Sequence, residues 1–141
     1  MKRLFLSLNL LFFSFFLLPA AQATEEPELS SLHKKVLGAW SLVQINGQTP
    51  EHQSTLQITR DNIFGNTGCN NFFATIGWLD QGFWEITPLL TTRKGCIGTQ
   101  FQQEKDILGV LLTEAMIRFD EISKQLIIEY DSKVLTYQKE S

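Results

Sequence analysis

Apolar and polar residues alternate along most of this chain, with the period of two that is typical of β-strands. In residues 39–45, for example, Trp40 and Leu42 fall on one face and their neighbours fall on the other. Turn-forming pairs such as Asn46-Gly47 separate the alternating runs. We therefore predict about eight strands, over residues 39–45, 55–59, 63–67, 73–79, 83–87, 116–120, 125–130 and 134–138.

One segment instead carries apolar residues at helical spacing. Its start is predicted at Thr99, because Thr99 and Gln102 fit a capping box in which each side chain satisfies a backbone N–H. The apolar face of this helix consists of Ile107, Leu108, Leu111, Leu112 and Ala115. Such a face is usually buried, so we expect the helix to pack against the strands.

The remaining elements are shorter. A helical turn is predicted over residues 32–36, capped by Ser30 or Ser31, and Pro88 starts an irregular segment that runs to Cys96. Strands joined by short turns pair antiparallel, and the apolar helix face needs an apolar partner. The predicted fold is therefore α+β, with a strongly curved antiparallel sheet or incomplete barrel of about eight strands packed with one long helix.

The N-terminus has the three parts of a secretory signal peptide. Lys2 and Arg3 precede an apolar stretch over residues 4–18, and Ala21 and Ala23 provide the small residues that a signal peptidase requires. The apolar stretch is shorter than the ~20 residues of a membrane-spanning helix, although an uncleaved membrane anchor is the alternative. Since no cysteine lies near the cleavage site, no lipid anchor is expected. We therefore expect an exported protein, periplasmic or secreted, that is soluble after cleavage of residues 1–23.

The cleaved chain is large enough for one domain with one core. Residues 24–35 are predicted to form a flexible acidic leader, and residues 36–141 the domain. The whole chain has a net charge of −3, and cleavage removes two basic residues and no acidic one, which leaves −5. A mildly acidic surface argues against binding of nucleic acid or anionic lipid through charge alone.

Cys69 and Cys96 are the chain's two cysteines. In an exported domain they are candidates for one disulfide, and two buried free thiols are the alternative. A metal site is not expected, because two cysteines lack the spacing of a zinc motif and His33 and His52 show no ligand-like pattern. Both histidines are predicted to be solvated, and no cofactor is expected.

Three motifs resemble those of the META domain, or HslJ-like, family. Residues 40–47 (WSLVQING) resemble its opening W-x-L-x-x-I-N-G pattern, and residues 68–72 (GCNNF) its G-C-N-x-F motif. Residues 91–96 (TTRKGC) resemble its T-R-M-A-C segment, with Lys94-Gly95 in place of the usual Met-Ala pair. The order and spacing of the motifs support the resemblance, which covers roughly residues 36–138.

The resemblance implies a small exported or envelope-associated domain whose antiparallel sheet curves around a helix. Members of the family have been linked loosely to stress response, antibiotic tolerance and motility. No catalytic residue or ligand is established for the family, so the resemblance assigns none to this chain.

The strongest polar cluster joins residues 67–71 to residues 91–93. Asn70, Asn71, Thr92 and Arg93 form a candidate binding loop, since Arg93 could bind a carboxylate or phosphate through two hydrogen bonds. The alternative is that these side chains satisfy the loop backbone while Arg93 pairs with a local acid. Trp78 and Trp84 flank a predicted turn, where they form either an exposed aromatic patch or part of the core.

No enzyme is expected, because no nucleophile and base are placed together by any recognised pattern.

Three functions stay open. The first is an envelope module that binds another, unknown envelope protein and acts in stress or antibiotic tolerance. The second is a carrier of a small apolar ligand, which needs an internal cavity, and the third is an enzyme inhibitor with a disulfide-stapled loop. We expect a monomer that binds no nucleic acid and is not stably inserted in a membrane.

Overall fold

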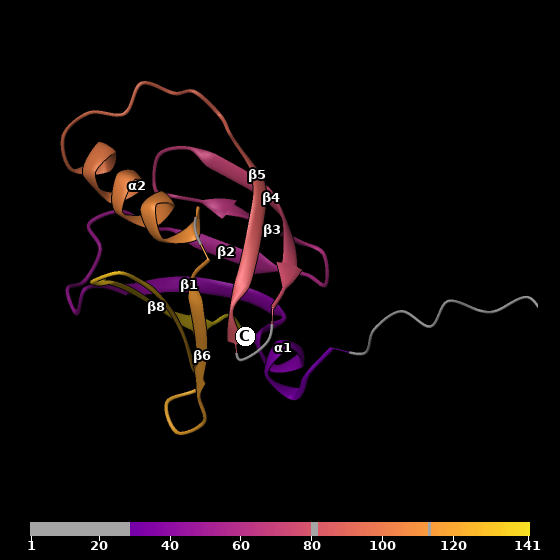
Figure 1. Cartoon of the computed structure of the whole chain (residues 1–141). Coiled ribbons are helices and arrows are strands. Elements are labelled where there is room, and N and C mark those ends of the chain that lie inside the picture. The colour runs from indigo at the N-terminus through magenta and orange to yellow at the C-terminus, as the bar shows by residue number, and fades with distance from the viewer. Residues whose placement is uncertain (1–28, 80–81, 113) are drawn as a thin grey trace, which may run out of the picture.

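The computed structural model describes residues 29–79, 82–112 and 114–141, and the predicted signal peptide and residues 24–28 of the predicted leader lie outside these residues. Within these described residues, eight strands and two helices follow one another (Figure 1). Their order is α1 (Ser31–Val36), β1 (Gly38–Ile45), β2 (Thr55–Ile58), β3 (Asn62–Asn66), β4 (Asn71–Trp78), β5 (Trp84–Thr91), α2 (Gly98–Leu111), β6 (Met116–Asp120), β7 (Gln125–Tyr130) and β8 (Lys133–Lys139).

All neighbouring strands pair antiparallel, in the order β5-β4-β3-β2-β1-β8-β7-β6. The two end strands approach each other where Phe83 bridges Met116 and the Trp84 N–H donates to the Ala115 carbonyl at 3.4 Å. The sheet therefore curls into a nearly closed barrel, with α2 packed against β7 and β8 (Figure 1). The predicted α+β class, the strand number and the strong curvature are confirmed.

The interior of the curved sheet is filled by large side chains. The inward positions of the strands follow the predicted alternation, as in β4, where Phe72, Ala74 and Ile76 are buried. Trp40 and Tyr137 are fully buried at the centre. The Trp40 indole N–H donates to the Val36 carbonyl at 2.9 Å, which anchors the end of α1 to the core.

β5 is longer than the sequence pattern indicates. The prediction of an irregular segment from Pro88 to Cys96 is wrong for residues 88–91, where pairing with β4 continues, and confirmed for residues 92–96, which have no regular structure. The register shifts at Pro88, where Leu89 faces Ala74 and Thr87 faces Thr75. Proline cannot donate a hydrogen bond, but it is tolerated at a bulge in an edge strand. The continuation of β5 brings the following loop close to the start of β4.

The start of α2 also differs from the prediction. Ile97 occupies the N-cap position and makes no side-chain capping bond. Thr99 lies inside the first turn, where its hydroxyl is 2.9 Å from the His52 Nε2, and Gln102 donates to Asp106 at 3.0 Å. The predicted capping box is therefore wrong, because the helix begins two residues earlier and both side chains make other contacts, Thr99 with the β1–β2 loop and Gln102 within the helix.

The apolar face predicted for α2 is only partly buried. Ile107 and Leu111 are in the core, but Leu112 follows the helix with half of its surface exposed. Ala115 is buried just before β6 rather than within the helix.

α1 forms at the predicted place, and the Ser30 hydroxyl caps it by accepting from the His33 N–H at 3.3 Å. The prediction that His33 is solvated is wrong. His33 is 7% exposed, and its ring lies 4.2 Å from that of Trp78. The α1 helix is therefore part of the folded domain.

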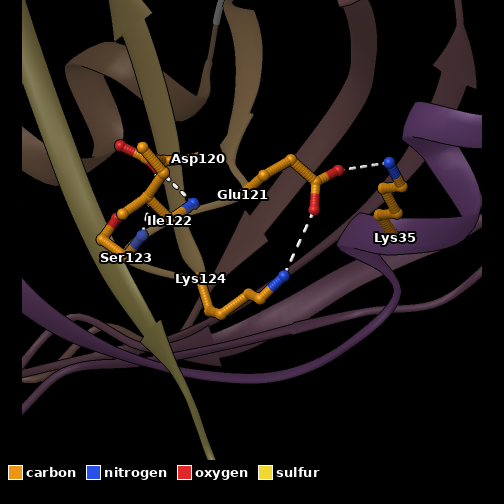
Figure 2. Close-up of polar contacts among 6 residues, drawn as sticks. All are labelled: Lys35, Asp120, Glu121, Ile122, Ser123 and Lys124. Carbon is orange, nitrogen blue, oxygen red and sulfur yellow. Dashed lines mark hydrogen bonds and ion pairs between the residues drawn. The ribbon is translucent and has the colours of Figure 1, made fainter.

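The turn between β6 and β7 binds α1 through exposed polar contacts (Figure 2). The Glu121 carboxylate contacts the ammonium groups of Lys35 on α1 and of Lys124 in the same turn. The Asp120 carboxylate accepts the N–H groups of Ile122 and Ser123 at 2.8 and 3.1 Å. Hydrogen bonds from Ser123 and Ile122 lower the pKa of Asp120, and the Lys35 contact lowers that of Glu121. These contacts fix the turn at the end of the barrel.

Candidate functional site

The candidate loops meet at a disulfide between Cys69 and Cys96, whose Cα atoms are 6.1 Å apart. Cys69 lies in the turn between β3 and β4, and Cys96 lies in the loop that leads into α2. This loop arches away from the sheet before the chain enters the helix (Figure 1). The bond therefore joins the two segments whose motifs carry the family resemblance.

Asn70 is the polar centre of this region and is only 3% exposed. Its Oδ1 accepts from the Thr92 hydroxyl and from the Lys94 N–H, both at 2.8 Å. Its Nδ2 donates to the Lys94 carbonyl at 3.3 Å and to Glu104 Oε1 at 3.0 Å, and lies 3.1 Å from the Cys96 sulfur. One amide side chain thus holds the loop on both sides of Lys94 and connects it to α2.

Glu104 and Gln103 bind the same region from α2. The Glu104 Oε2 accepts from the Thr67 hydroxyl at 2.7 Å and from the Asn70 N–H at 3.1 Å. The Gln103 amide donates to the carbonyls of Thr67 and His52 at 2.7 and 2.9 Å, and its oxygen accepts from the His52 N–H at 3.1 Å. The first turns of α2 therefore hold both the β3–β4 turn and the β1–β2 loop.

Gly68 allows this close approach. Its φ is +97°, a left-handed conformation that disfavours side chains. A Cβ at this position would lie 2.5 Å from the Gln103 Nε2 and 2.8 Å from the His52 Cβ. The glycine of the G-C-N motif is therefore required by the backbone and by its neighbours.

The predicted loop residues divide into two groups. Asn70 and the Thr92 hydroxyl satisfy groups of the loop, as the structural alternative proposed. Asn71 is exposed and accepts from Asn66 Nδ2 at 2.7 Å. Arg93 is exposed, and it forms no ion pair with the part of the chain that the structure describes. Asn71, Thr92 and Arg93 are exposed and so accessible to a partner, whereas Asn70 is buried.

Trp78 and Trp84 do not form an exposed aromatic patch. Trp84 is fully buried, and Trp78 is half-buried against the core with its indole N–H bonded to the Arg60 carbonyl at 2.6 Å. The ring centroids are 6.2 Å apart. The core alternative is therefore correct for Trp84.

An exposed apolar row lies instead on the outer face of β3, β4 and β5. Phe64 is directly opposite Phe73 in the sheet register, and Phe73 is directly opposite Leu90. These side chains are 41, 42 and 62% exposed. Opposite residues on one face of a sheet are in contact range, so the three side chains form a continuous surface, which we call the outer-sheet row. The next row along the strands is polar and contains Thr55, Asn66 and Asn71.

The described residues offer little for metal binding or catalysis. Ligand atoms of Cys69, Cys96 and Glu104 lie within 4.8 Å of one another, but metals bind thiolates, and both sulfurs are in the disulfide. The His52 ring is within hydrogen-bond distance of the Thr99 hydroxyl. Within residues 29–79, 82–112 and 114–141, no acid holds the other ring nitrogen, as the third member of a catalytic triad would.

An open hollow separates the β1–β2 loop from α2, and Asp106 lies on its wall. The Lys133 ammonium donates to the Asp106 carboxylate at 2.7 Å and so links β8 to α2. Partial burial would by itself raise the pKa of Asp106, but hydrogen bonds from Lys133 and Gln102 lower it below its ordinary value of 3.8.

This ion pair predicts a pH-dependent contribution to stability. Because the folded-state pKa of Asp106 is lowered, the contribution is present above pH 3.8 and is lost as the pH falls through the folded-state value. At neutral pH, Asp106→Asn should lower the free energy of unfolding by about 0.5–1 kcal/mol, since the pair is partly exposed. Urea denaturation of both proteins should show this difference shrinking in acid, and a difference that is constant with pH would contradict the assignment.

The curved sheet, its packed helix and the disulfide between two loops define a class of small α+β domains. Residues 33–141 match the META domain, and the chain belongs to this family. No curated protein matches the chain in sequence. Neither α1 nor α2 has the length and apolarity that crossing a bilayer requires.

Two solved structures share the fold. One is an NMR structure of a protein from Burkholderia xenovorans, with 18% sequence identity and a TM-score of 0.60 over 88% of this chain and 99% of that chain. The other is an NMR structure with 23% identity and a TM-score of 0.57 over 72% of this chain and 87% of that chain. At these identities the similarity establishes the fold alone.

Proposed function

We propose that this protein is an exported, non-enzymatic module of the cell envelope that binds another protein through the outer-sheet row. The observation that carries the proposal is the alignment of Phe64, Phe73 and Leu90 across three neighbouring strands. Single exposed apolar residues are common on protein surfaces, but contiguous ones mark interaction sites. A role in stress or antibiotic tolerance, which the family resemblance implies, would be exerted through the bound partner.

The surroundings of the row favour a protein partner. An apolar centre with a polar rim is the usual arrangement of a protein–protein interface. Thr55, Asn66 and Asn71 supply such a rim on one side, and their amide and hydroxyl groups can exchange hydrogen bonds with a partner's backbone or side chains. The rim residues named here carry no charge, so shape and apolar contact would determine affinity.

The other functions have less support. A ligand carrier needs an internal cavity, but Trp40, Trp84 and Tyr137 fill the interior, and the larger hollows formed by the described residues are open at the surface. An enzyme needs titratable groups that converge in a cleft. The polar groups of the disulfide region instead bond to one another and to the backbone.

The proposal is tested by affinity capture from an envelope extract with the oxidised chain that begins at Thr24, which contains every described residue. Phe73→Ser removes the centre of the row, and Ile122→Ser is the matched control because Ile122 is 96% exposed on the distant β6–β7 turn. We expect a partner that the wild-type and Ile122→Ser proteins retain and the Phe73→Ser protein loses. A partner retained equally by all three proteins, or no reproducible partner, would contradict the proposal.

A further inference from the structure

The α2 helix has apolar residues on two faces, and only one of them is covered by the sheet. Ile107, Val110 and Leu111 are fully buried against the barrel. At 3.6 residues per turn, Phe101, Lys105, Leu108 and Leu112 fall within an arc of about 60° on the side away from these residues. Phe101 and Leu112 are 56 and 50% exposed, and Leu108 between them is half-buried and packs against the core. The solvent side of α2 therefore carries an apolar stripe whose exposed members are Phe101 and Leu112.

The loop before α2 extends this stripe. Ile97, directly before the helix, is 83% exposed. Arg93 and Lys94 are exposed in the same loop, and neither side chain forms an ion pair with a described residue. Lys105 adds a third exposed cation on the stripe itself. We call Arg93, Lys94, Ile97, Phe101, Lys105 and Leu112 the helix–loop surface.

The charge of this surface is opposite to that of the chain. The net charge of the chain is −3, yet the loop before α2 and the stripe together carry three exposed cations. Glu104 borders the stripe, but its carboxylate is turned to Thr67 and Asn70. Asp106 lies on another side of the helix and is paired with Lys133. The Arg93 and Lys94 charges are therefore available to an anionic partner, whereas the Lys105 charge is partly balanced by the neighbouring Asp106 carboxylate.

We propose that the helix–loop surface docks reversibly on an anionic lipid surface. Cations beside exposed Ile, Phe and Leu side chains are the composition of segments that lie in the bilayer interface, where the apolar groups enter the acyl boundary and the cations meet the headgroups. The acidic balance of the whole chain argues against lipid binding by charge alone, but the local cluster combines charge with apolar contact.

The disulfide region prepares this surface for binding. Lys94 is held at its N–H and its carbonyl by Asn70, and Cys96 is held by the disulfide. The loop therefore has little conformational entropy left to lose when its side chains contact lipid, and preorganisation of this kind favours binding. The buried Asn70 side chain thus contributes to lipid binding indirectly, because it holds the loop that exposes Arg93, Lys94 and Ile97 to the membrane.

The test is co-sedimentation of the oxidised chain from Thr24 onward with phosphatidylcholine vesicles that contain or lack phosphatidylglycerol. Starting at Thr24 removes the apolar N-terminal segment, which would bind lipid by itself. We expect binding to the vesicles with phosphatidylglycerol, weaker binding as salt is added, and little binding to phosphatidylcholine alone. Arg93→Gln and Lys94→Gln should each weaken binding about fivefold, and Phe101→Ser about tenfold.

Phe73→Ser is the matched control, because it removes an exposed phenylalanine from the outer-sheet row and should leave vesicle binding unchanged. Phe101→Trp and Phe73→Trp give a second readout. Only the emission of Phe101→Trp should shift to shorter wavelength with the anionic vesicles.

Failure of the wild-type protein to bind the anionic vesicles at low salt, or equal effects of the substitutions at Phe101 and Phe73, would overturn the proposal. A change in self-association by Phe101→Ser without any effect on lipid binding would instead assign the surface to a second copy of the chain.

This inference is independent of the proposed protein-binding function. Phe73→Ser should abolish partner capture and spare lipid binding, and Phe101→Ser should do the reverse. The two variants therefore show separately whether the protein-binding proposal or the lipid-binding proposal fails.

Discussion

Reduction of the Cys69–Cys96 disulfide should lower the free energy of unfolding by about 3–4 kcal/mol. The bond closes a loop of 27 residues, and a crosslink stabilises mainly by restricting the unfolded chain, by an amount that grows with loop length. The loop contains all of β4 and β5, so its closure also limits the ways in which these strands can pair.

Urea denaturation of the oxidised and reduced proteins measures this effect, with the Cys69→Ser, Cys96→Ser double variant as a control for the reductant. The reduced protein and the double variant should have the same lowered midpoint. Equal midpoints for the oxidised and reduced proteins would show that Asn70 and Glu104 hold the loops without help from the covalent bond.

Asn70→Ala should lower the free energy of unfolding by about 2–4 kcal/mol. Truncation leaves the Lys94 N–H and one Glu104 carboxylate oxygen without their Asn70 partner, and a buried polar group without a partner costs about 1–3 kcal/mol. Because Lys94 would be released, its amide should also exchange faster with solvent.

Asn71→Ala is the matched control, since Asn71 is the adjacent residue but is exposed. Its effect should stay within about 0.5 kcal/mol of the wild-type value. Comparable losses for the two variants would contradict the central role of the Asn70 side chain. Asn70→Asp should be at least as harmful as Asn70→Ala, because it would bring a second carboxylate next to Glu104.

The sequence predicts the sheet well because its inward positions are set by local alternation. Phe72, Ala74 and Ile76 show the rule in β4, where every second residue is buried. The end of β5 is predicted wrongly because Pro88 is expected to terminate the strand. A strand at the edge of a sheet tolerates a proline, and whether a strand lies at the edge depends on the whole sheet. The edge position of β5 could not be derived from its own residues.

The site is harder to predict, because its contacts join residues that are distant in the chain. The sequence analysis correctly assigns Asn70 and Thr92 to one polar cluster. It does not identify Gln103 and Glu104 of α2 as hydrogen-bond partners of this cluster. Their signal is weak: they are polar residues beside the buried face of a helix, where apolar residues are expected. His33 is misassigned for a similar reason, because its burial depends on the Trp78 ring.

The buried and exposed parts of the loops have separate roles in this account. Asn70, Glu104 and the disulfide determine where the loop lies, and Arg93, Lys94 and Ile97 provide its contacts. The outer-sheet row forms a second surface, on a different part of the fold. A module with two such surfaces could hold a partner protein near a membrane.

Partner capture by the Phe73→Ser protein, beside the wild-type and Phe101→Ser proteins, tests the proposed protein-binding function most directly. The substitution lies at the centre of the outer-sheet row, where a serine should not disturb the fold because the side chain is 42% exposed. Our account predicts that Phe73→Ser loses the captured partner and that Phe101→Ser retains it. Retention of the partner by Phe73→Ser with wild-type affinity would contradict the account.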